Sequence, residues 1–139
     1  MNNLDKKFSE IRDGFSVLEG QDKLVYLIDL GKKIDQIDSK DKVEKNKVNA
    51  CTSQTWIKIE NDKFVTLKAD SESAIVKGLL QILQIGFNNS EKKSIIDFID
   101  EFDEPIKIFE WLNIGPTISS QRQNGFIGAL LFIKKELNK

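Results

Sequence analysis

The chain has 139 residues and a mass of 15.9 kDa, with 40% hydrophobic and 31% charged residues, which is the size and balance of one ordinary folded domain. Histidine is absent and cysteine occurs once, which excludes His-dependent catalytic triads, Cys/His zinc sites and an intrachain disulfide. The formal net charge of −1 gives no electrostatic drive toward nucleic acid, and we expect no nucleic-acid partner.

No apolar stretch is long enough to span a bilayer. Even Phe126 to Ile133 falls far short of the roughly 18 residues required, so we expect no membrane partner. The charged start of the chain does not resemble a secretory signal, and a lone thiol suits a reducing compartment, which favours the cytoplasm. Because no repeat, low-complexity tract or linker divides the sequence, residues 1–139 are predicted to form a single domain.

The first third of the chain predicts two helices and a loop. Apolar residues recur at helical spacing in a first helix, at Leu4, Phe8, Ile11 and Phe15. Asp22 can cap a second helix that ends near Lys32 and Lys33. Residues 35–47 are mostly charged and predict an exposed loop.

Alternating apolar and polar residues predict a β-hairpin in the middle of the chain. Residues 56–60 and 64–69 form its strands around a turn at 61–63, and Val48 is expected to start a third strand just upstream. These strands are expected to form a small antiparallel sheet, in which residues 50–53 form the bend that leads into the hairpin.

The remainder predicts four helices. Asp70, followed by Ser71, is expected to cap a buried helix over residues 74–87, and a fourth helix carries Ile95, Ile96, Ile99 and Phe102. Pro105 suits the first turn of a short helix that runs through Trp111, and Ser119 or Ser120 can cap a last helix to Leu137. The acidic residues between positions 97 and 104 predict a solvated face. The order of helices, sheet and helices indicates the α+β class.

Cys51 carries the only thiol of the chain, and a thiol can ionise near neutral pH to a nucleophilic thiolate. An inert, buried cysteine is the commoner case in proteins, but the neighbours of Cys51 are small and polar, which suggests an exposed turn. Lysines 42, 45 and 47 lie just upstream and favour the thiolate. Without histidine, Cys/His catalysis is excluded, whereas attack by the thiolate on a sulfane sulfur or disulfide needs no histidine.

Four segments resemble the SufE family of sulfur acceptors, which work with SufS-type cysteine desulfurases in iron–sulfur cluster assembly. The segment at 48–56, VNACTSQTW, is similar to the family pattern V-x-G-C-x-S-x-x-W, and SSQRQNG at 119–125 is similar to S-x-x-R-x-N-G. Two further similarities are LVYLIDLG at 24–31 and DSESAIVKGL at 70–79. The four segments occur in the family's order and cover nearly the whole chain. Ala50 departs from the pattern, which has glycine before the cysteine.

The resemblance implies a SufE/IscU-like α+β fold with a three-stranded antiparallel sheet flanked by helices. It implies that Cys51 accepts persulfide sulfur from a SufS-type desulfurase, stimulates that enzyme and donates the sulfur to a scaffold such as a SufB-containing complex. No cofactor is expected on this chain, because the pyridoxal phosphate belongs to the partner. We therefore interpret the protein as a sulfurtransferase-type carrier rather than a self-sufficient enzyme.

Arg122 and the chain as a whole each have more than one interpretation. Arg122 either supports the thiol loop, as the resemblance implies, or braces the last helix. The chain as a whole is either a sulfur carrier, an adaptor that binds the desulfurase without carrying sulfur, or a small interaction domain with an unreactive thiol.

Overall fold

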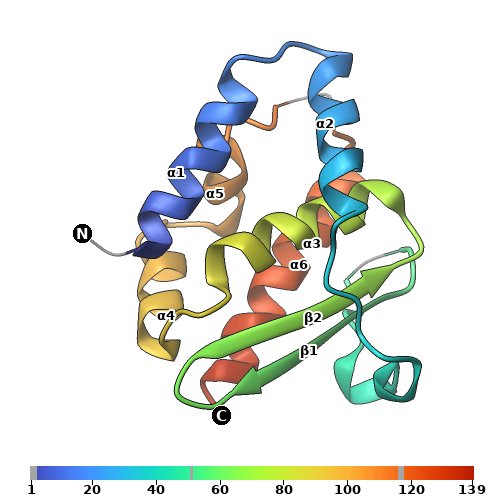
Figure 1. The fold of residues 1–139 in the computed structure, drawn as a ribbon, viewed down its shortest axis with the longest axis vertical. Coiled ribbons are helices and arrows are strands. Elements are labelled where there is room, and N and C mark those ends of the chain that lie inside the picture. Colours follow the sequence, from blue (N-terminus) through green and yellow to red (C-terminus); the bar gives the residue numbers. More distant parts are fainter. Residues whose placement is uncertain (1–2, 51, 116–117) are drawn as a thin grey trace.

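The elements of the computed structural model follow the predicted order of helices, hairpin and helices (Figure 1). The structure describes residues 3–50, 52–115 and 118–139. The helices are α1 (Asn3–Ser16), α2 (Gln21–Gly31), α3 (Ala74–Phe87), α4 (Lys92–Asp100), α5 (Pro105–Trp111) and α6 (Ser120–Leu137), and the strands are β1 (Thr55–Asn61) and β2 (Val65–Ser71). The α+β class is thereby confirmed.

The sheet has two strands within the described residues, so the expectation of a three-stranded sheet is wrong. β1 and β2 pair antiparallel from Thr55↔Ser71 to Asn61↔Val65. Upstream of β1 the chain makes one isolated antiparallel bridge, Lys47↔Trp56. The 3₁₀ turn at Glu44–Asn46 immediately before this bridge keeps the backbone out of an extended conformation, so pairing cannot extend backwards.

The segment between α2 and β1 is more firmly anchored than its charged composition suggests. Ile37 is buried, and the backbone on both sides of Gln36 bonds to Ala69 of β2, at 3.1 and 3.2 Å. Gln84, buried in α3, accepts a hydrogen bond from the Asp35 N–H at 3.0 Å and donates one to the Asp35 carbonyl at 2.8 Å. The prediction of an exposed loop therefore fails for Ile37, whereas Asp35 and Gln36 are exposed as predicted.

Helix α3 is the buried centre of the fold, as the sequence predicts. It packs against α1, α2, α6 and β2 (Figure 1). It crosses α2 where two glycines meet: a Cβ on Gly31 would lie 2.7 Å from the Gly78 nitrogen, and a Cβ on Gly78 would overlap the Leu27 carbonyl oxygen. Only hydrogen at these positions permits so close a crossing.

The helix starts confirm some of the predicted caps and correct others. Ser119 caps α6, and Pro105 occupies the first turn of α5. Asp22 lies inside the first turn of α2, whose N-cap is Gly20 at a φ of 52°. Asp70 is not the cap of α3, because β2 continues through it and Ser73 accepts the capping hydrogen bond from the Val76 N–H at 3.3 Å.

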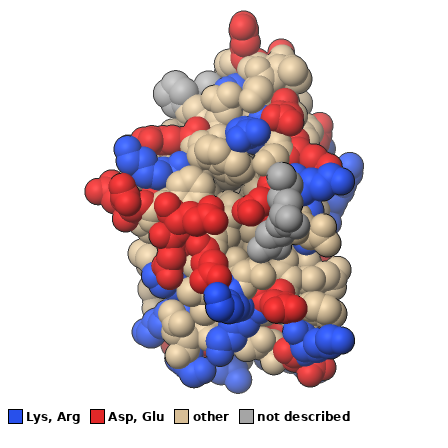
Figure 2. Space-filling view, turned by 90° about the vertical axis from the view of Figure 1, so that its left-hand side faces the viewer, with Lys and Arg blue, Asp and Glu red and all other residues tan. Residues whose placement is uncertain are grey.

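The predicted solvated face is confirmed on and after α4. Its acidic side chains are exposed, at Asp97, Asp100, Glu101, Asp103 and Glu104. Figure 2 views the side of the molecule that carries α1 and α4 in Figure 1, and acidic side chains gather in its middle part. Among the described helices, none combines the length and apolar character that a membrane crossing requires.

Candidate functional site

Cys51, the predicted acceptor thiol, lies outside the described residues. The site is therefore defined by the chain on either side of it. Ala50 and Thr52 are both exposed, whereas Val48 is buried and its N–H donates to the Thr55 carbonyl at 2.9 Å. The described residues between Val48 and Thr55 are thus exposed or half-buried, with a buried residue at each end.

A buried chain of hydroxyl groups fixes the point where the segment returns. The Thr55 hydroxyl donates to the Ser53 carbonyl at 3.1 Å and lies 2.9 Å from the Ser71 hydroxyl. Because a hydroxyl has a single proton, Ser71 must be the donor to Thr55. The Ser71 hydroxyl in turn accepts from the Ser73 N–H at 3.2 Å. The start of β1 is thereby tied to the start of α3.

Arg122 reaches the same segment from the first turn of α6. Its Nη1 donates a hydrogen bond to the Ser53 hydroxyl at 3.1 Å, across 69 positions of sequence. The Ser119 cap orders this first turn by accepting from the Arg122 backbone N–H at 3.3 Å. Of the two alternatives for Arg122, the structure thus contains the contact with the thiol-bearing segment, and it places a guanidinium on the residue two positions after Cys51 in sequence.

On the other side of Cys51, Ala50 lies against Gly128 of α6. A Cβ built on Gly128 would overlap the Cβ of Ala50. The positive φ angles among the described residues belong to Gly20, Asn89, Asn113 and Gly115. Ala50 is not one of them, so alanine in place of the family's glycine carries no left-handed strain. Sequence reasoning missed both Ser53 and Gly128, since each acts through a partner far along the chain.

A cluster of charges lies at the base of the hairpin. Lys42 donates to Asp70 at 2.8 Å and lies over the Trp56 ring, 5.1 Å from its centroid, while Lys77 lies 3.6 Å from Asp70. Burial raises the pKa of Asp70, but hydrogen bonds from Lys42 and the Ser71 N–H and the charges of Lys42 and Lys77 outweigh it, so the pKa lies below its ordinary value. Lys42, one of the lysines expected to favour the thiolate, is therefore engaged by Asp70.

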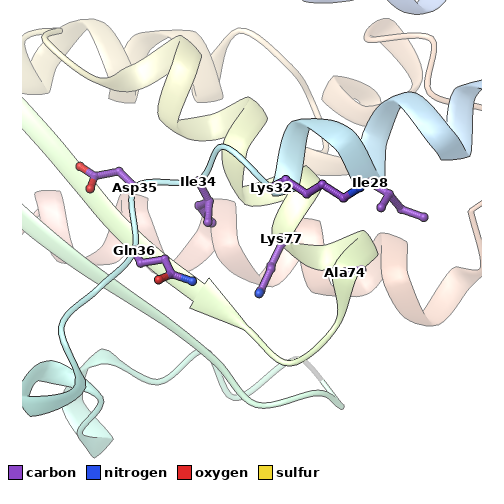
Figure 3. A pocket seen from close by; sticks show the side chains of 8 residues that line it. Ile28, Lys32, Ile34, Asp35, Gln36, Ala74 and Lys77 are labelled. Atoms are coloured by element: carbon purple, nitrogen blue, oxygen red, sulfur yellow. The ribbon is translucent and has the colours of Figure 1, made fainter.

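Two cavities flank these elements. One of about 380 Å³ lies beside the thiol-bearing segment and is lined by Lys47, Ala50, Gly128, Leu131 and Lys135 among others. The other, of about 530 Å³, lies where α2 ends and α3 begins. Figure 3 shows Lys32, Lys77, Asp35 and Gln36 at the wall of this second cavity. Neither Arg122 nor Ala50 lines it. Among the described residues, no cluster of three or more acidic side chains has the geometry to hold a metal ion.

A known family matches the chain across this site. The model of the SufE family, described as an Fe-S metabolism associated domain, matches residues 9–137. The chain belongs to the SufE family. The match includes the segment around Cys51 and the α6 residues that contact it.

Relatives support the same membership. An uncharacterised SufE-like protein of Rhizobium meliloti (strain 1021) is 32% identical over 133 residues, which is 91% of each chain. SufE-like protein 1, chloroplastic/mitochondrial, of Arabidopsis thaliana is 30% identical over 136 residues, which is 96% of this chain and 35% of the plant protein. In fold, the chain resembles the solution structure of a hypothetical protein from Thermus thermophilus, with a TM-score of 0.76 at 16% identity over 95% of this chain and 93% of that one.

Proposed function

We propose that this SufE-family protein accepts persulfide sulfur on Cys51 from a SufS-type cysteine desulfurase and passes it on for iron–sulfur cluster assembly. The observation that carries the proposal is the hydrogen bond from Arg122 to Ser53 at 3.1 Å, which brings a cation to the segment of the chain's single thiol. A cation near a cysteine favours its thiolate, and the thiolate is the nucleophile in sulfur exchange.

The proposed reaction needs no oxidant and no histidine. The Cys51 thiolate attacks the terminal sulfur of the desulfurase persulfide, and a new S–S bond forms on Cys51. The S–S bond to the desulfurase cysteine breaks, and that cysteine leaves as a thiolate. Sulfane sulfur is transferred without net oxidation or reduction, which matches a chain that has no second cysteine to form an internal disulfide.

The partners follow from this chemistry. The donor is a SufS-type desulfurase, which supplies the pyridoxal phosphate, and the acceptor is a scaffold such as a SufB-containing complex. With one cysteine and no histidine, a single copy of this chain lacks the ligands to hold a cluster itself. We propose the cytoplasm as the compartment, because a reducing environment keeps a lone thiol available.

Intact mass spectrometry tests the proposal directly. The protein is incubated with a SufS-type desulfurase, cysteine and pyridoxal phosphate, with the Cys51→Ser variant as the control. The expected result is a gain of one sulfur atom that dithiothreitol removes and that the variant does not show.

The same experiment separates the carrier from an adaptor. Stimulated desulfurase turnover without any mass gain, retained in Cys51→Ser, would show that the chain acts only by binding. If the protein shows no mass gain and does not stimulate the desulfurase, the proposed function is contradicted.

A further inference from the structure

Helix α6 contacts the chain on both sides of Cys51. After the cysteine, Ser53 accepts a hydrogen bond from Arg122. Before the cysteine, Ala50 lies against Gly128. Both contact residues belong to one helix, so a single rigid element determines where the two flanks of the thiol lie.

The contact of Ala50 with α6 depends on the missing side chain of Gly128. The overlap of a Cβ at position 128 would be confined to the Ala50 Cβ, because the next nearest atoms, the Ala50 Cα and Val48 Cγ1, would each lie 3.7 Å away. A distance of 3.7 Å is an ordinary van der Waals contact. Between residues 50 and 128 there is therefore room for one methyl group, and Ala50 supplies it.

Gly128 stands where a helix ordinarily disfavours glycine. It lies well inside α6, which runs from Ser120 to Leu137, and glycine in a helix interior is less favourable than alanine. The close approach of Ala50 gives a physical reason for glycine at this position. A glycine at position 50 would remove this contact.

We propose that Gly128 is a positioning residue for Cys51: its missing side chain seats the methyl group of Ala50 on α6 and so holds the residue before the thiol against the last helix. Because a helix packed against Ala50 obstructs the approach of a reagent from that side, we expect the neighbouring thiol to react faster when Ala50 is lifted from α6. The effect on sulfur transfer rests on the proposed function, whereas the seating itself does not.

The test measures the reaction of the thiol with a small neutral disulfide, 4,4′-dithiodipyridine, in the absence of any desulfurase. Because the chain has one cysteine, the absorbance change reports Cys51 alone. Four proteins are compared: the wild type, Gly128→Ala, Ala50→Gly and the double variant. Thermal unfolding followed by circular dichroism establishes that each variant is folded.

Gly128→Ala is expected to raise the rate constant by about threefold or more, because the new methyl group displaces Ala50, and couplings of this size are usual between touching residues. The double variant should return to the rate of Ala50→Gly or below it, since one of the two methyl groups has been removed. A Gly128→Ala rate at or below that of the wild type would overturn the proposal, as would a double variant that reacts faster than Ala50→Gly and as fast as Gly128→Ala.

The test still decides if one variant does not fold or if the proposed function is wrong. If Gly128→Ala does not fold, Ala50→Gly alone decides, because loss of the seated methyl should raise the rate and an unchanged rate would contradict the seating. Failure of the wild type to take up sulfur from a desulfurase would overturn the proposed function and would leave this rate comparison intact.

Discussion

Arg122 and Ser53 are joined by a hydrogen bond of 3.1 Å although 69 positions separate them in the sequence. The donor is in the first turn of α6 and the acceptor is in the segment between Cys51 and β1. A guanidinium delivers both a fixed hydrogen-bond direction and a permanent positive charge. The same contact therefore holds the segment in place and brings a positive charge to it.

Substitution of Arg122 should slow sulfur uptake. Arg122→Gln removes the charge and the bond to Ser53, and it is expected to lower the rate of persulfide formation roughly fivefold, which corresponds to about 1 kcal/mol for one charge-assisted hydrogen bond near solvent. Arg122→Lys keeps the charge and should retain more activity. Time-resolved intact mass with a SufS-type desulfurase measures both.

The matched control is the other arginine of the chain, Arg12, which lies over the Trp111 ring at 4.6 Å from its centroid. Arg12→Gln makes the same chemical change away from Ser53 and should leave the rate unchanged. Equal slowing in the Arg12 and Arg122 variants would show that the effect is one of net charge.

Removal of the Thr55 hydroxyl should destabilise the fold. In Thr55→Val the buried Ser71 hydroxyl loses the acceptor 2.9 Å away, and the expected loss is about 1–3 kcal/mol of unfolding free energy. Urea denaturation measures it. Thr66→Val, at a half-buried position of β2, serves as the control and should stay within about 0.5 kcal/mol of the wild type.

The lowered pKa of Asp70 predicts a pH-dependent contribution to stability. A carboxyl whose pKa is lower in the folded state than its ordinary value of 3.8 stabilises the fold above that value and loses the contribution as pH falls through the folded-state pKa. Asp70→Asn should therefore cost about 1–2 kcal/mol at pH 7 and progressively less below pH 3.8. Thermal unfolding across pH 2–7 measures the difference.

Asp29→Asn is the control for this series. Asp29 pairs with Lys32 at 3.5 Å, but its side chain is 60% exposed, so the pair should contribute little at any pH. A difference between wild type and Asp70→Asn that is the same at pH 2 and pH 7 would refute the ionic explanation.

The glycine crossing of α2 and α3 should not tolerate a side chain. Gly78→Ala forces a methyl group onto the Leu27 carbonyl, which is backbone and cannot rotate away, and the expected destabilisation is about 2 kcal/mol or more. Gly14→Ala in α1 places its methyl 3.3 Å from the Tyr26 hydroxyl, at the end of a side chain, and should be tolerated. Equal midpoints in a urea titration of the two variants would contradict this account.

Sequence patterns were most informative where local rules determine the structure. α5 has the bounds that Pro105 and Trp111 predict, and α3 covers the predicted residues 74–87, because helix starts and apolar periodicity are properties of neighbouring residues. The motif at 119–125 also directed attention to Arg122. Its hydroxyl partner was beyond prediction, because nothing near Ser53 in the sequence indicates a partner in the last helix.

The wrong predictions share a cause in long-range contacts. Aspartate is a common helix cap, which is why the sequence predicts this role for Asp70. Pairing of Ser71 with Thr55 instead extends β2 past Asp70, and Lys42 and Lys77 pair with its carboxylate. The charge of the segment predicts that Ile37 is exposed, yet Ile37 is buried, and Gln84 and Ala69 bond to the backbone around it. In each case a partner far along the chain outweighs the local preference.

Helix α6 also has a consequence for the order in which the site forms during synthesis. Ribosomes complete α6 after every other helix and strand of the fold, whereas Cys51 leaves the ribosome far earlier. A nascent chain that ends before Ser120 already contains the thiol but lacks both Arg122 and Gly128, so neither flank of Cys51 can contact α6 until about the last 20 residues have been added. The contacts of α6 with Ser53 and Ala50 are non-local ones, which places their formation among the late events of folding.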